Sequence, residues 1–180
     1  MRLILLDRDG VINEDSDDYI KAPEEWHPIP GSLEAIAQLH HAGYRVLVLT
    51  NQSGLARGLF DPDTLARIHQ RMYQALAAVG GAVSGVFFCP HGPGDDCRCR
   101  KPLPGLFEEV AQRLQVSLDG VPAVGDSLRD LRAAEAAGAR PILVRTGKGR
   151  HTEAALPANH GYPVFEDLAA VVRWLLAEPA

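Results

Sequence analysis

The amino-acid sequence predicts an α/β protein built on a doubly wound parallel β-sheet. Two observations lead to this class. Short apolar runs alternate along the chain with longer stretches that have the apolar spacing of helices. Strands that are apolar at every position are typical of parallel sheets covered on both faces, a Rossmann-like architecture. The chain has 180 residues, so we expect one domain, residues 1–180, with its own core.

Five apolar runs are the predicted strands. The first is residues 3–6 (LILL) and the second is residues 46–49 (VLVL), each long enough for a buried strand and too short for a helix. The remaining runs are residues 86–88, 121–124 and 142–144. In sheets of this kind the site lies beyond the carboxyl ends of the strands. The residues that follow each run are therefore the first candidates for function.

The stretches between these runs are the predicted helices. The clearest begins at Asp61 and Pro62, ends at the glycine pair 80–81 and has apolar residues on one face from Leu65 to Val79. The others follow the same reasoning: residues 33–40 stopped by Gly43, a helix opened by Pro104 and running to Leu114, an alanine-rich helix ending at Gly138, and a last helix that includes residues 171–175.

Charge and apolar run lengths exclude several classes of protein. The formal charge is −5 and the basic residues are scattered, which argues against a nucleic-acid surface. No apolar run approaches the roughly 18 residues of a membrane span, and the N-terminal run stops at Asp7, which is unlike a secretory signal. Three cysteines do not suit a disulfide framework. We expect a cytoplasmic protein.

Polar side chains follow the predicted strands at the points where a site is expected. Because parallel strands end at one edge of the sheet, these side chains should lie together. In chain order they are four carboxylates, one hydroxyl and one lysine, namely Asp7, Asp9, Thr50, Lys101, Asp126 and Asp130. Carboxylates gathered in this way repel unless a cation joins them, and oxygen ligands point to Mg²⁺. The pattern therefore predicts a magnesium site.

A calcium-binding loop is a rival interpretation of residues 7–18 (DRDGVINEDSDD). Such a loop needs glycine at its sixth position and glutamate at its twelfth, between two helices. Here Gly10 is the fourth residue, Asp18 is the twelfth, and a strand precedes the segment. The calcium interpretation is therefore discarded.

The chemistry open to these residues is phosphoryl transfer. Asp7 can attack phosphorus as a carboxylate nucleophile and form an aspartyl-phosphate. Asp9 lies two residues on, on the same side of an extended segment, where it can protonate the leaving oxygen and then activate water. Thr50 and Lys101 can bind phosphate oxygens while Mg²⁺ neutralises developing charge.

The loop 89–99 carries all three cysteines of the chain and a histidine. Cys89, His91, Cys97 and Cys99 form a Cys3His set, which zinc binds tetrahedrally in structural sites. A filled shell leaves no open position for water, so the predicted zinc is structural. Arg100 and Lys101 follow the last cysteine directly, so ordering the loop would position the lysine.

Four segments resemble the motifs of the haloacid dehalogenase superfamily of phosphohydrolases. They are DRDGVIN, LTNQSGLARG, CRCRKPLPG and VGDSLRD, and they span residues 7–130. The first two resemble the histidinol-phosphatase-like branch. The cysteine loop resembles that of its D-glycero-D-manno-heptose 1,7-bisphosphate 7-phosphatases, although some histidinol phosphatases carry a similar loop.

This resemblance implies roles for individual residues. Asp7 would be the nucleophile and Asp9 the general acid and base, with Mg²⁺ held by the Asp7 and Asp126 side chains and the backbone carbonyl of Asp9. Asp130 would support the metal ligands from behind. The substrate would be contacted by Asp15, Ser16, Asp17, Asp18, Tyr19, Thr50, Asn51, Gln52, Ser53, Arg100 and Lys101.

Four features keep two interpretations. Arg57 could reach a second phosphate or be an exposed arginine at a helix start. Residues 145–151 (RTGKGRH) could form a phosphate-binding nest or a glycine-rich surface loop. Tyr19 and Trp26 could wall the pocket or pack. Asp17 and Asp18 could contact the substrate or belong to an acidic solvated turn. Separately, some relatives carry lysine where Ser127 stands here, which leaves no contact assigned to Ser127.

The implied function is removal of the 7-phosphate from heptose bisphosphate, in the synthesis of ADP- or GDP-heptose precursors of the lipopolysaccharide core. The alternatives are a histidinol-phosphate phosphatase and, of another class, a zinc-ordered phosphate-ester binding module without catalysis. A polynucleotide 3′-phosphatase has related motifs, but the acidic charge argues against it. Because no large insertion follows the first or third strand, we expect a domain without a cap. We also expect a monomer whose partner is a small sugar bisphosphate, with no nucleic-acid or membrane partner.

Overall fold

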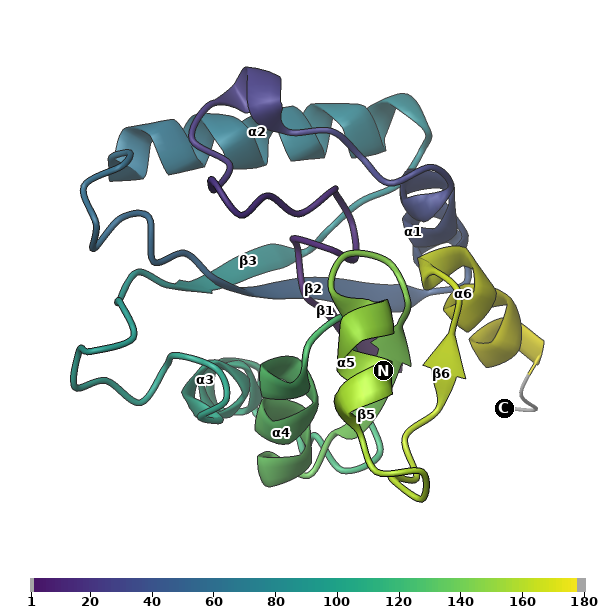
Figure 1. The fold of residues 1–180 in the computed structure, drawn as a ribbon. Coiled ribbons are helices and arrows are strands. Elements are labelled where there is room, and N and C mark those ends of the chain that lie inside the picture. Colours follow the sequence, from purple (N-terminus) through teal and green to yellow (C-terminus); the bar gives the residue numbers. More distant parts are fainter. Residues whose placement is uncertain (1, 178–180) are drawn as a thin grey trace.

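The computed structural model describes residues 2–177, so Met1 and residues 178–180 of the predicted domain lie outside the described residues. Its centre is a parallel sheet of six strands in the order β3-β2-β1-β4-β5-β6 (Figure 1). The strands are β1 (Arg2–Leu6), β2 (Tyr44–Asn51), β3 (Gly85–Cys89), β4 (Pro122–Gly125), β5 (Arg140–Val144) and β6 (Val164–Phe165). The five predicted strands are confirmed, and the two-residue β6 is too short to give an apolar run.

Helices join the strands in the predicted alternation. They are α1 (Ser32–His41), α2 (Pro62–Ala78), α3 (Gly105–Leu114), α4 (Leu128–Ala136), α5 (Gly149–Ala155) and α6 (Leu168–Ala177), with a 3-10 turn η1 at Pro23–Glu25. The side chain of Asp61 caps α2 by accepting a hydrogen bond from the backbone of Thr64 at 2.7 Å. Helix α5 was not predicted, because residues 145–151 are glycine and polar residues and show no apolar spacing typical of a helix.

Both faces of the sheet are buried, which explains the uninterrupted apolar strands. In β1, Ile4 and Leu6 face a core shared with α1, α2 and α6, whereas Leu3 and Leu5 face a second core shared with α3 and α4. This alternation follows from the two-residue repeat of a strand. Trp26 belongs to the first core at 1% exposure, so it packs and does not wall a pocket.

The order of the strands reverses at β1, and this reversal positions the site. From β1 the chain winds outward through β2 and β3, and then returns to the other side of β1 for β4, β5 and β6. Leu6 pairs with Val124 in the register of β1 and β4, so Asp7 and Asp126 leave the sheet side by side. Crevices at such reversal points are where ligands bind in α/β sheets.

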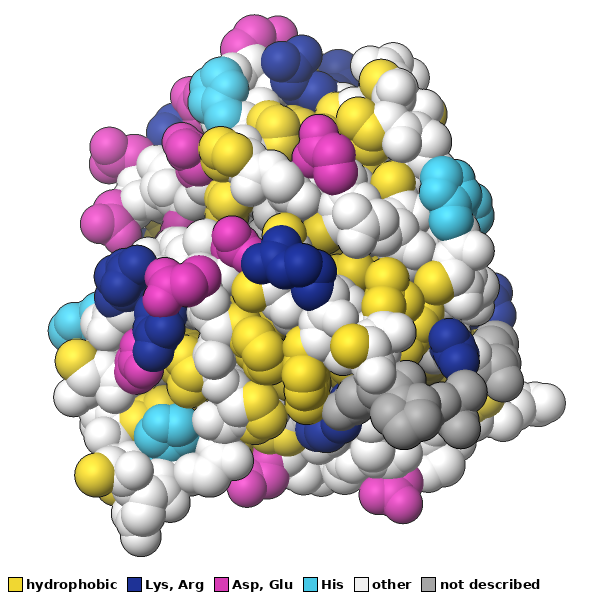
Figure 2. Space-filling model, turned by 90° about the vertical axis from the view of Figure 1, so that its right-hand side faces the viewer, with side chains coloured by type: hydrophobic (Ala, Val, Ile, Leu, Met, Phe, Trp, Pro, Cys, Tyr) yellow, Lys and Arg dark blue, Asp and Glu magenta, His cyan; other side chains and the backbone are white. Residues whose placement is uncertain are grey.

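Nothing in residues 2–177 folds into a separate unit above this crevice, because the segments after β1 (7–31) and β3 (90–104) carry one 3-10 turn between them. Figure 2 shows the face near α1, α6 and β6, where hydrophobic side chains gather at the centre and charges of both signs surround them. No described helix has the length and apolar character required to cross a membrane.

Candidate active site

Three buried carboxylates meet where β1 and β4 end. Asp7 follows β1, Asp126 follows β4, and Asp130 lies in the first turn of α4. One oxygen from each carboxylate lies within 4.8 Å of the others. The Lys101 ammonium closes the group, at 3.0 Å from Asp7 Oδ1 and 2.6 Å from Asp130 Oδ1, and it donates to the carbonyl of Leu49 at 2.8 Å. Lys101 is only 2% exposed, which excludes a solvated surface role.

The cluster carries more negative charge than one lysine neutralises. Burial raises the pKa of Asp7 to about 7, against the lowering effect of Lys101 and with further raising from Asp130. Burial, followed by Asp130 and Asp7, raises the pKa of Asp126 to about 8. Burial also acts on Asp130, but Lys101 lowers its pKa below the usual value. A divalent cation would let all three carboxylates ionise together, so the donor set fits Mg²⁺.

The Asp126 carboxylate is closely surrounded by backbone from Gly10, Gly147 and Lys148, which we call its seat. The backbone N–H of Lys148 donates to Asp126 Oδ2 at 2.7 Å. Gly10 and Gly147 approach the same oxygen so closely that a Cβ on either would collide with it, and both have positive φ, +82° and +56°. Glycine is therefore required twice, for the backbone conformation and for space.

The Asp9 carboxylate is fixed by three neighbouring side chains. Arg8 donates to it through Nε at 3.0 Å and Nη2 at 3.1 Å, Asn13 donates through Nδ2 at 2.9 Å, and Gln52 donates through Nε2 at 3.0 Å. Arg8 is fully buried, and its Nη1 lies 3.2 Å from His69 Nε2. Burial and the Arg8 charge lower the pKa of His69 to about 4, so the ring is neutral and can accept from Arg8.

The residues at the end of β2 and directly after it hold Asp9 and the Lys101 backbone. Thr50 is 1% exposed and accepts a hydrogen bond from Gln52 Nε2 at 2.9 Å. Asn51 donates to the Lys101 carbonyl at 3.0 Å and accepts from the Lys101 backbone N–H at 3.1 Å. This reciprocal pair means that Asn51 holds the Lys101 backbone in addition to lining the cavity.

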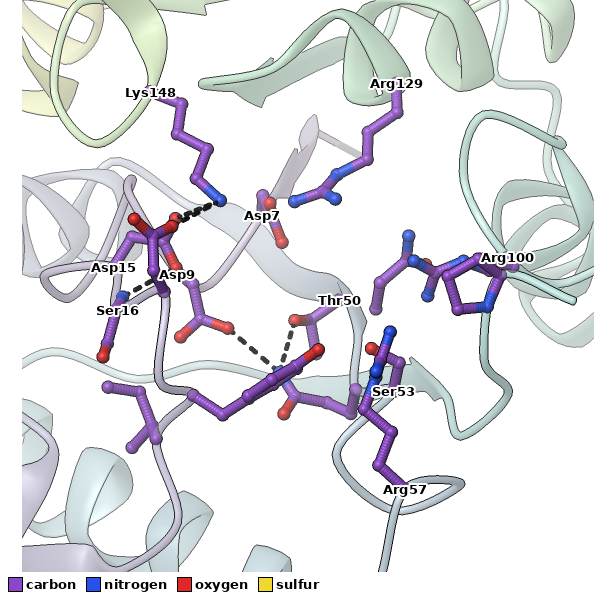
Figure 3. A pocket seen from close by; sticks show the side chains of 16 residues that line it. Asp7, Asp9, Asp15, Ser16, Thr50, Ser53, Arg57, Arg100, Arg129 and Lys148 are labelled. Atoms are coloured by element: carbon purple, nitrogen blue, oxygen red, sulfur yellow. Dashed lines mark hydrogen bonds and ion pairs between the residues drawn. The ribbon is translucent and has the colours of Figure 1, made fainter. Parts of the chain in front are cut away.

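A cavity opens above these groups (Figure 3). Ser53 and the segment after β1 contribute to its wall through Asp15, Ser16, Asp17 and Tyr19. Asp18 is not among the residues that line it; its carbonyl accepts from Lys21 Nζ at 2.5 Å.

Four basic side chains line the same cavity: Arg57, Arg100, Arg129 and Lys148. Arg57 lies over the ring of Tyr19, 5.7 Å from its centre. Lys148 pairs with Asp15 at 3.2 Å and Asp17 at 3.4 Å, so it ties the start of α5 to the segment after β1. Cations around a polar cavity suit a multiply charged anion.

Sequence reasoning gave no role to Arg8, Asn13, His69 and Arg129, and it considered Lys148 only as part of residues 145–151. Arg129 follows β4, so the strand-end rule could have found it. Arg8 and His69 left no comparable signal, because their meeting depends on the packing of α2 over the loop after β1.

The four side chains of the Cys3His set converge. Cys89 Sγ lies 3.9 Å from Cys97 Sγ, 3.0 Å from Cys99 Sγ and 3.5 Å from His91 Nδ1, which is 3.3 Å from Cys99 Sγ. Zinc bonds of about 2.3 Å to sulfur set tetrahedral sulfur atoms about 3.8 Å apart. The Cys89–Cys97 distance matches this value, and the Cys89–Cys99 distance would widen around an ion. The convergence of three thiols and a ring nitrogen suits zinc, with His91 as an Nδ1 ligand. Arg100 Nη1 donates to the His91 carbonyl at 3.2 Å, which links the loop to the cavity wall.

Comparison with protein families gives two matches. The HAD-hydrolase-like family model matches residues 98–171, and the model of the polynucleotide kinase 3 phosphatase family matches residues 2–134. Together they cover the strand-end residues described above.

Curated relatives match almost the whole chain. A D-glycero-beta-D-manno-heptose-1,7-bisphosphate 7-phosphatase of Bordetella bronchiseptica is 59% identical, with 99% of both chains covered. One of the same name from Pseudomonas putida is 53% identical, with 98% of this chain and 100% of the relative covered. Among solved structures, D,D-heptose 1,7-bisphosphate phosphatase from B. bronchiseptica, complexed with magnesium and phosphate, has a TM-score of 0.96 at 59% identity over 99% of this chain and 100% of that chain.

Proposed function

The chain belongs to the D-glycero-β-D-manno-heptose-1,7-bisphosphate 7-phosphatase family of the haloacid dehalogenase superfamily, and from that premise we propose that it removes the 7-phosphate of D-glycero-β-D-manno-heptose 1,7-bisphosphate. The observation that carries the proposal is the buried group of Asp7, Asp126, Asp130 and Lys101 beneath a cavity lined by basic side chains. The carboxylate nucleophile has Lys101 beside it, and a separate set of basic side chains lines the cavity above. This arrangement suits a substrate with two phosphates.

The reaction would proceed in two steps on the chain's own carboxylates. Asp7 attacks phosphorus, the bond from phosphorus to the sugar oxygen breaks, and Asp9 gives its proton to that oxygen. Asp9 then accepts a proton from water, whose oxygen attacks the aspartyl-phosphate and releases inorganic phosphate and free Asp7. Thr50 and Lys101 bind phosphate oxygens during both steps. The contacts from Arg8, Asn13 and Gln52 keep Asp9 in position for both proton transfers.

Mg²⁺ is the cofactor that the carboxylate cluster fits. Its ligands would be the Asp7 and Asp126 side chains and the backbone carbonyl of Asp9, with Asp130 holding Lys101 behind them. When bound, the ion neutralises charge that develops on the phosphoryl oxygens. The seat formed by Gly10, Gly147 and the Lys148 backbone keeps Asp126 turned toward this position.

A structural zinc ion is the second proposed cofactor. Cys89, His91, Cys97 and Cys99 would fill its four positions, so it would take no part in bond breaking. Its contribution would be to order the loop whose next residues are Arg100 and Lys101. Three free thiols suit the reducing cytoplasm, where we also place the protein.

Histidinol phosphate is the competing substrate, and the charge of the cavity argues against it. Histidinol phosphate carries one phosphate and a cationic amine, whereas the cavity wall presents Arg57, Arg100 and Arg129. Asp15 and Asp17 are the acidic groups that could bind the amine, and both pair with Lys148. A second phosphate on the substrate would offer these arginines an anionic partner, which the amine of histidinol phosphate would not.

The test is phosphate release from a panel containing both anomers of heptose 1,7-bisphosphate, histidinol phosphate and a 3′-phosphorylated oligonucleotide, with Mg²⁺ present. We expect the β-anomer of the bisphosphate to give the highest kcat/KM. A higher value for histidinol phosphate or for the oligonucleotide would contradict the proposed substrate, and no turnover of any substrate would favour a binding module.

The proposal also covers the oligomeric state of the protein, the biosynthesis in which it acts and its partners. All the proposed site residues come from one chain, so a monomer suffices, and we propose that the single phosphohydrolase domain acts alone on a small sugar bisphosphate. The reaction would belong to the synthesis of ADP- or GDP-heptose for the lipopolysaccharide core. Neither a nucleic-acid nor a membrane partner is needed for it.

A further inference from the structure

Among residues 2–177, no side chain forms a hydrogen bond or an ion pair with the charged side chain of Arg129. It is the second residue of α4, and Figure 3 shows its guanidinium directed into the cavity beside Asp7. Its Nε is buried, and within residues 2–177 that atom has no hydrogen-bond partner. No carboxylate oxygen in the described part of the chain is recorded in an ion pair with it, although Asp7 and Asp130 both pair with Lys101.

The charge of Arg129 is nevertheless maintained. Burial acts to lower its pKa, but Asp130, Asp7, Asp126 and Asp15 together raise the pKa above the usual value. A buried donor left without an acceptor costs free energy, more so when it is charged. Carboxylates near enough to act on the guanidinium but not bonded to it leave its donors available to a ligand.

The backbone at Arg129 is held on both sides. Ser127 caps α4, and its backbone N–H donates to Asp130 Oδ2 at 3.0 Å. Asp130 is in turn fixed by Lys101. The start of the helix is therefore rigid, and the direction in which Arg129 can extend is set by the same residues that hold the nucleophile.

Arg129 and Arg100 stand together at the boundary of two hollows. Both line the main cavity above Asp7, and both line a second hollow between the cysteine loop and α4, with Pro93, Cys97 and Leu103. Arg100 is anchored to the His91 carbonyl through Nη1. Both guanidinium groups therefore line the same opening, and each can bind phosphate oxygens through paired hydrogen bonds.

We propose that Arg129, paired with Arg100, binds the phosphate that the reaction leaves in place and so determines the preference for a bisphosphate. This inference rests on the proposed function. The phosphate that is cleaved must reach Asp7, where Thr50 and Lys101 supply the donors, and a second phosphate on the same small sugar needs separate cations. Arg129 fits this role because no group in the described part of the chain accepts a hydrogen bond from its Nε.

The experiment compares two substrates in one variant. Arg129→Gln removes the charge and the terminal guanidinium donors while keeping a polar side chain. The kcat/KM is measured with Mg²⁺ for the heptose bisphosphate and for p-nitrophenyl phosphate, which has no second phosphate. We expect the ratio of the two kcat/KM values to fall by roughly 10- to 100-fold, the range for charged hydrogen bonds. Arg129→Lys, which keeps the charge without the paired donors, should give an intermediate ratio.

The matched control is Arg132→Gln, because Arg132 lies on the same helix and is exposed. Its ratio should equal that of the wild type. Loss of both activities in equal proportion in Arg129→Gln would overturn the inference, since it would mean that Arg129 serves the acidic cluster or the transferred phosphate. An unchanged ratio would overturn it as well.

Failure of the proposed function would look different. In that case the wild type itself would show no preference for the bisphosphate over p-nitrophenyl phosphate, and the inference about Arg129 would fall with it. The inhibition constant of the product, heptose 1-phosphate, gives an independent measurement. It should rise in Arg129→Gln, because the product keeps the phosphate that Arg129 binds, and an unchanged constant would count against the subsite.

Discussion

The carboxylate cluster and the cysteine loop are both suited to a metal ion, but the chain builds them in different ways. Asp7 and Asp126 extend from adjacent strands whose pairing fixes their separation, and their backbones are buried. Cys97 and Cys99 lie on a polar loop without helix or strand. The sheet therefore holds the first site before a metal arrives, whereas we propose that the loop needs a zinc ion for its order. The two sites meet at Lys101, which follows the loop and contacts the cluster.

The sharpest test of the cluster is the nucleophile. Asp7→Asn preserves the size of the side chain but removes the charge that attacks phosphorus. We expect turnover to fall by about three orders of magnitude or more, as in other cases where a nucleophile is removed. Phosphate release measures this, and the exposed Asp119→Asn provides the control. Turnover within tenfold of the wild type would show that Asp7 is not the nucleophile.

A substitution at Gly147 tests whether the backbone around Asp126 holds this carboxylate in position for the metal. Gly147→Ala would place a methyl group against Asp126 Oδ2, so we expect the Mg²⁺ concentration for half-maximal activity to rise by at least roughly tenfold, about 1.4 kcal/mol. Gly120→Ala is the matched control, because Gly120 also has positive φ, +70°, but has open space around its Cβ position. Equal effects in the two variants would assign the loss to backbone strain and not to the seat.

The loop is tested by Cys97→Ala, which removes one zinc ligand. We expect zinc content to fall and kcat/KM to fall by about tenfold, because Arg100 and Lys101 lose their fixed position, while circular dichroism of the sheet and helices stays close to the wild type. Asp96→Ala, an exposed neighbour in the same loop, is the control. Full turnover in a zinc-free Cys97→Ala protein would show that the activity of the carboxylate cluster does not depend on the cysteine loop.

The smallest expected effect concerns pH. Asp7 and Asp126 have folded pKa values of about 7 and about 8, above those of ordinary carboxyl groups. Without metal, the stability linked to these shifts is present at acidic pH and is lost as pH rises through 7 and 8. Mg²⁺ needs the ionised forms, so the rise in Tm caused by a fixed Mg²⁺ concentration should be larger at pH 8.5 than at pH 6 by a few degrees. An Mg²⁺ effect independent of pH would contradict this linkage.

The sequence predicted the site where a residue type and a strand end coincide. Asp7, Thr50 and Asp126 each follow a buried apolar run, and parallel strands bring such positions to one edge without further information. The cysteine loop could be predicted for a different reason, since its four candidate ligands lie within eleven consecutive residues. In both cases the signal is local or depends on a topology that the apolar pattern already implies.

The contacts that the sequence left undetermined are those between elements. Whether Lys101 is buried, whether Asn51 holds its backbone and whether His69 meets Arg8 all depend on how loops and helices pack over the sheet edge. By itself the sequence determined the fold class, the position of the edge and the chemical groups that reach it, because strand periodicity and ligand spacing are encoded locally. Only the tertiary structure decided which charges are paired and which, like Arg129, remain available, because pairing is fixed by distances between residues far apart in the chain.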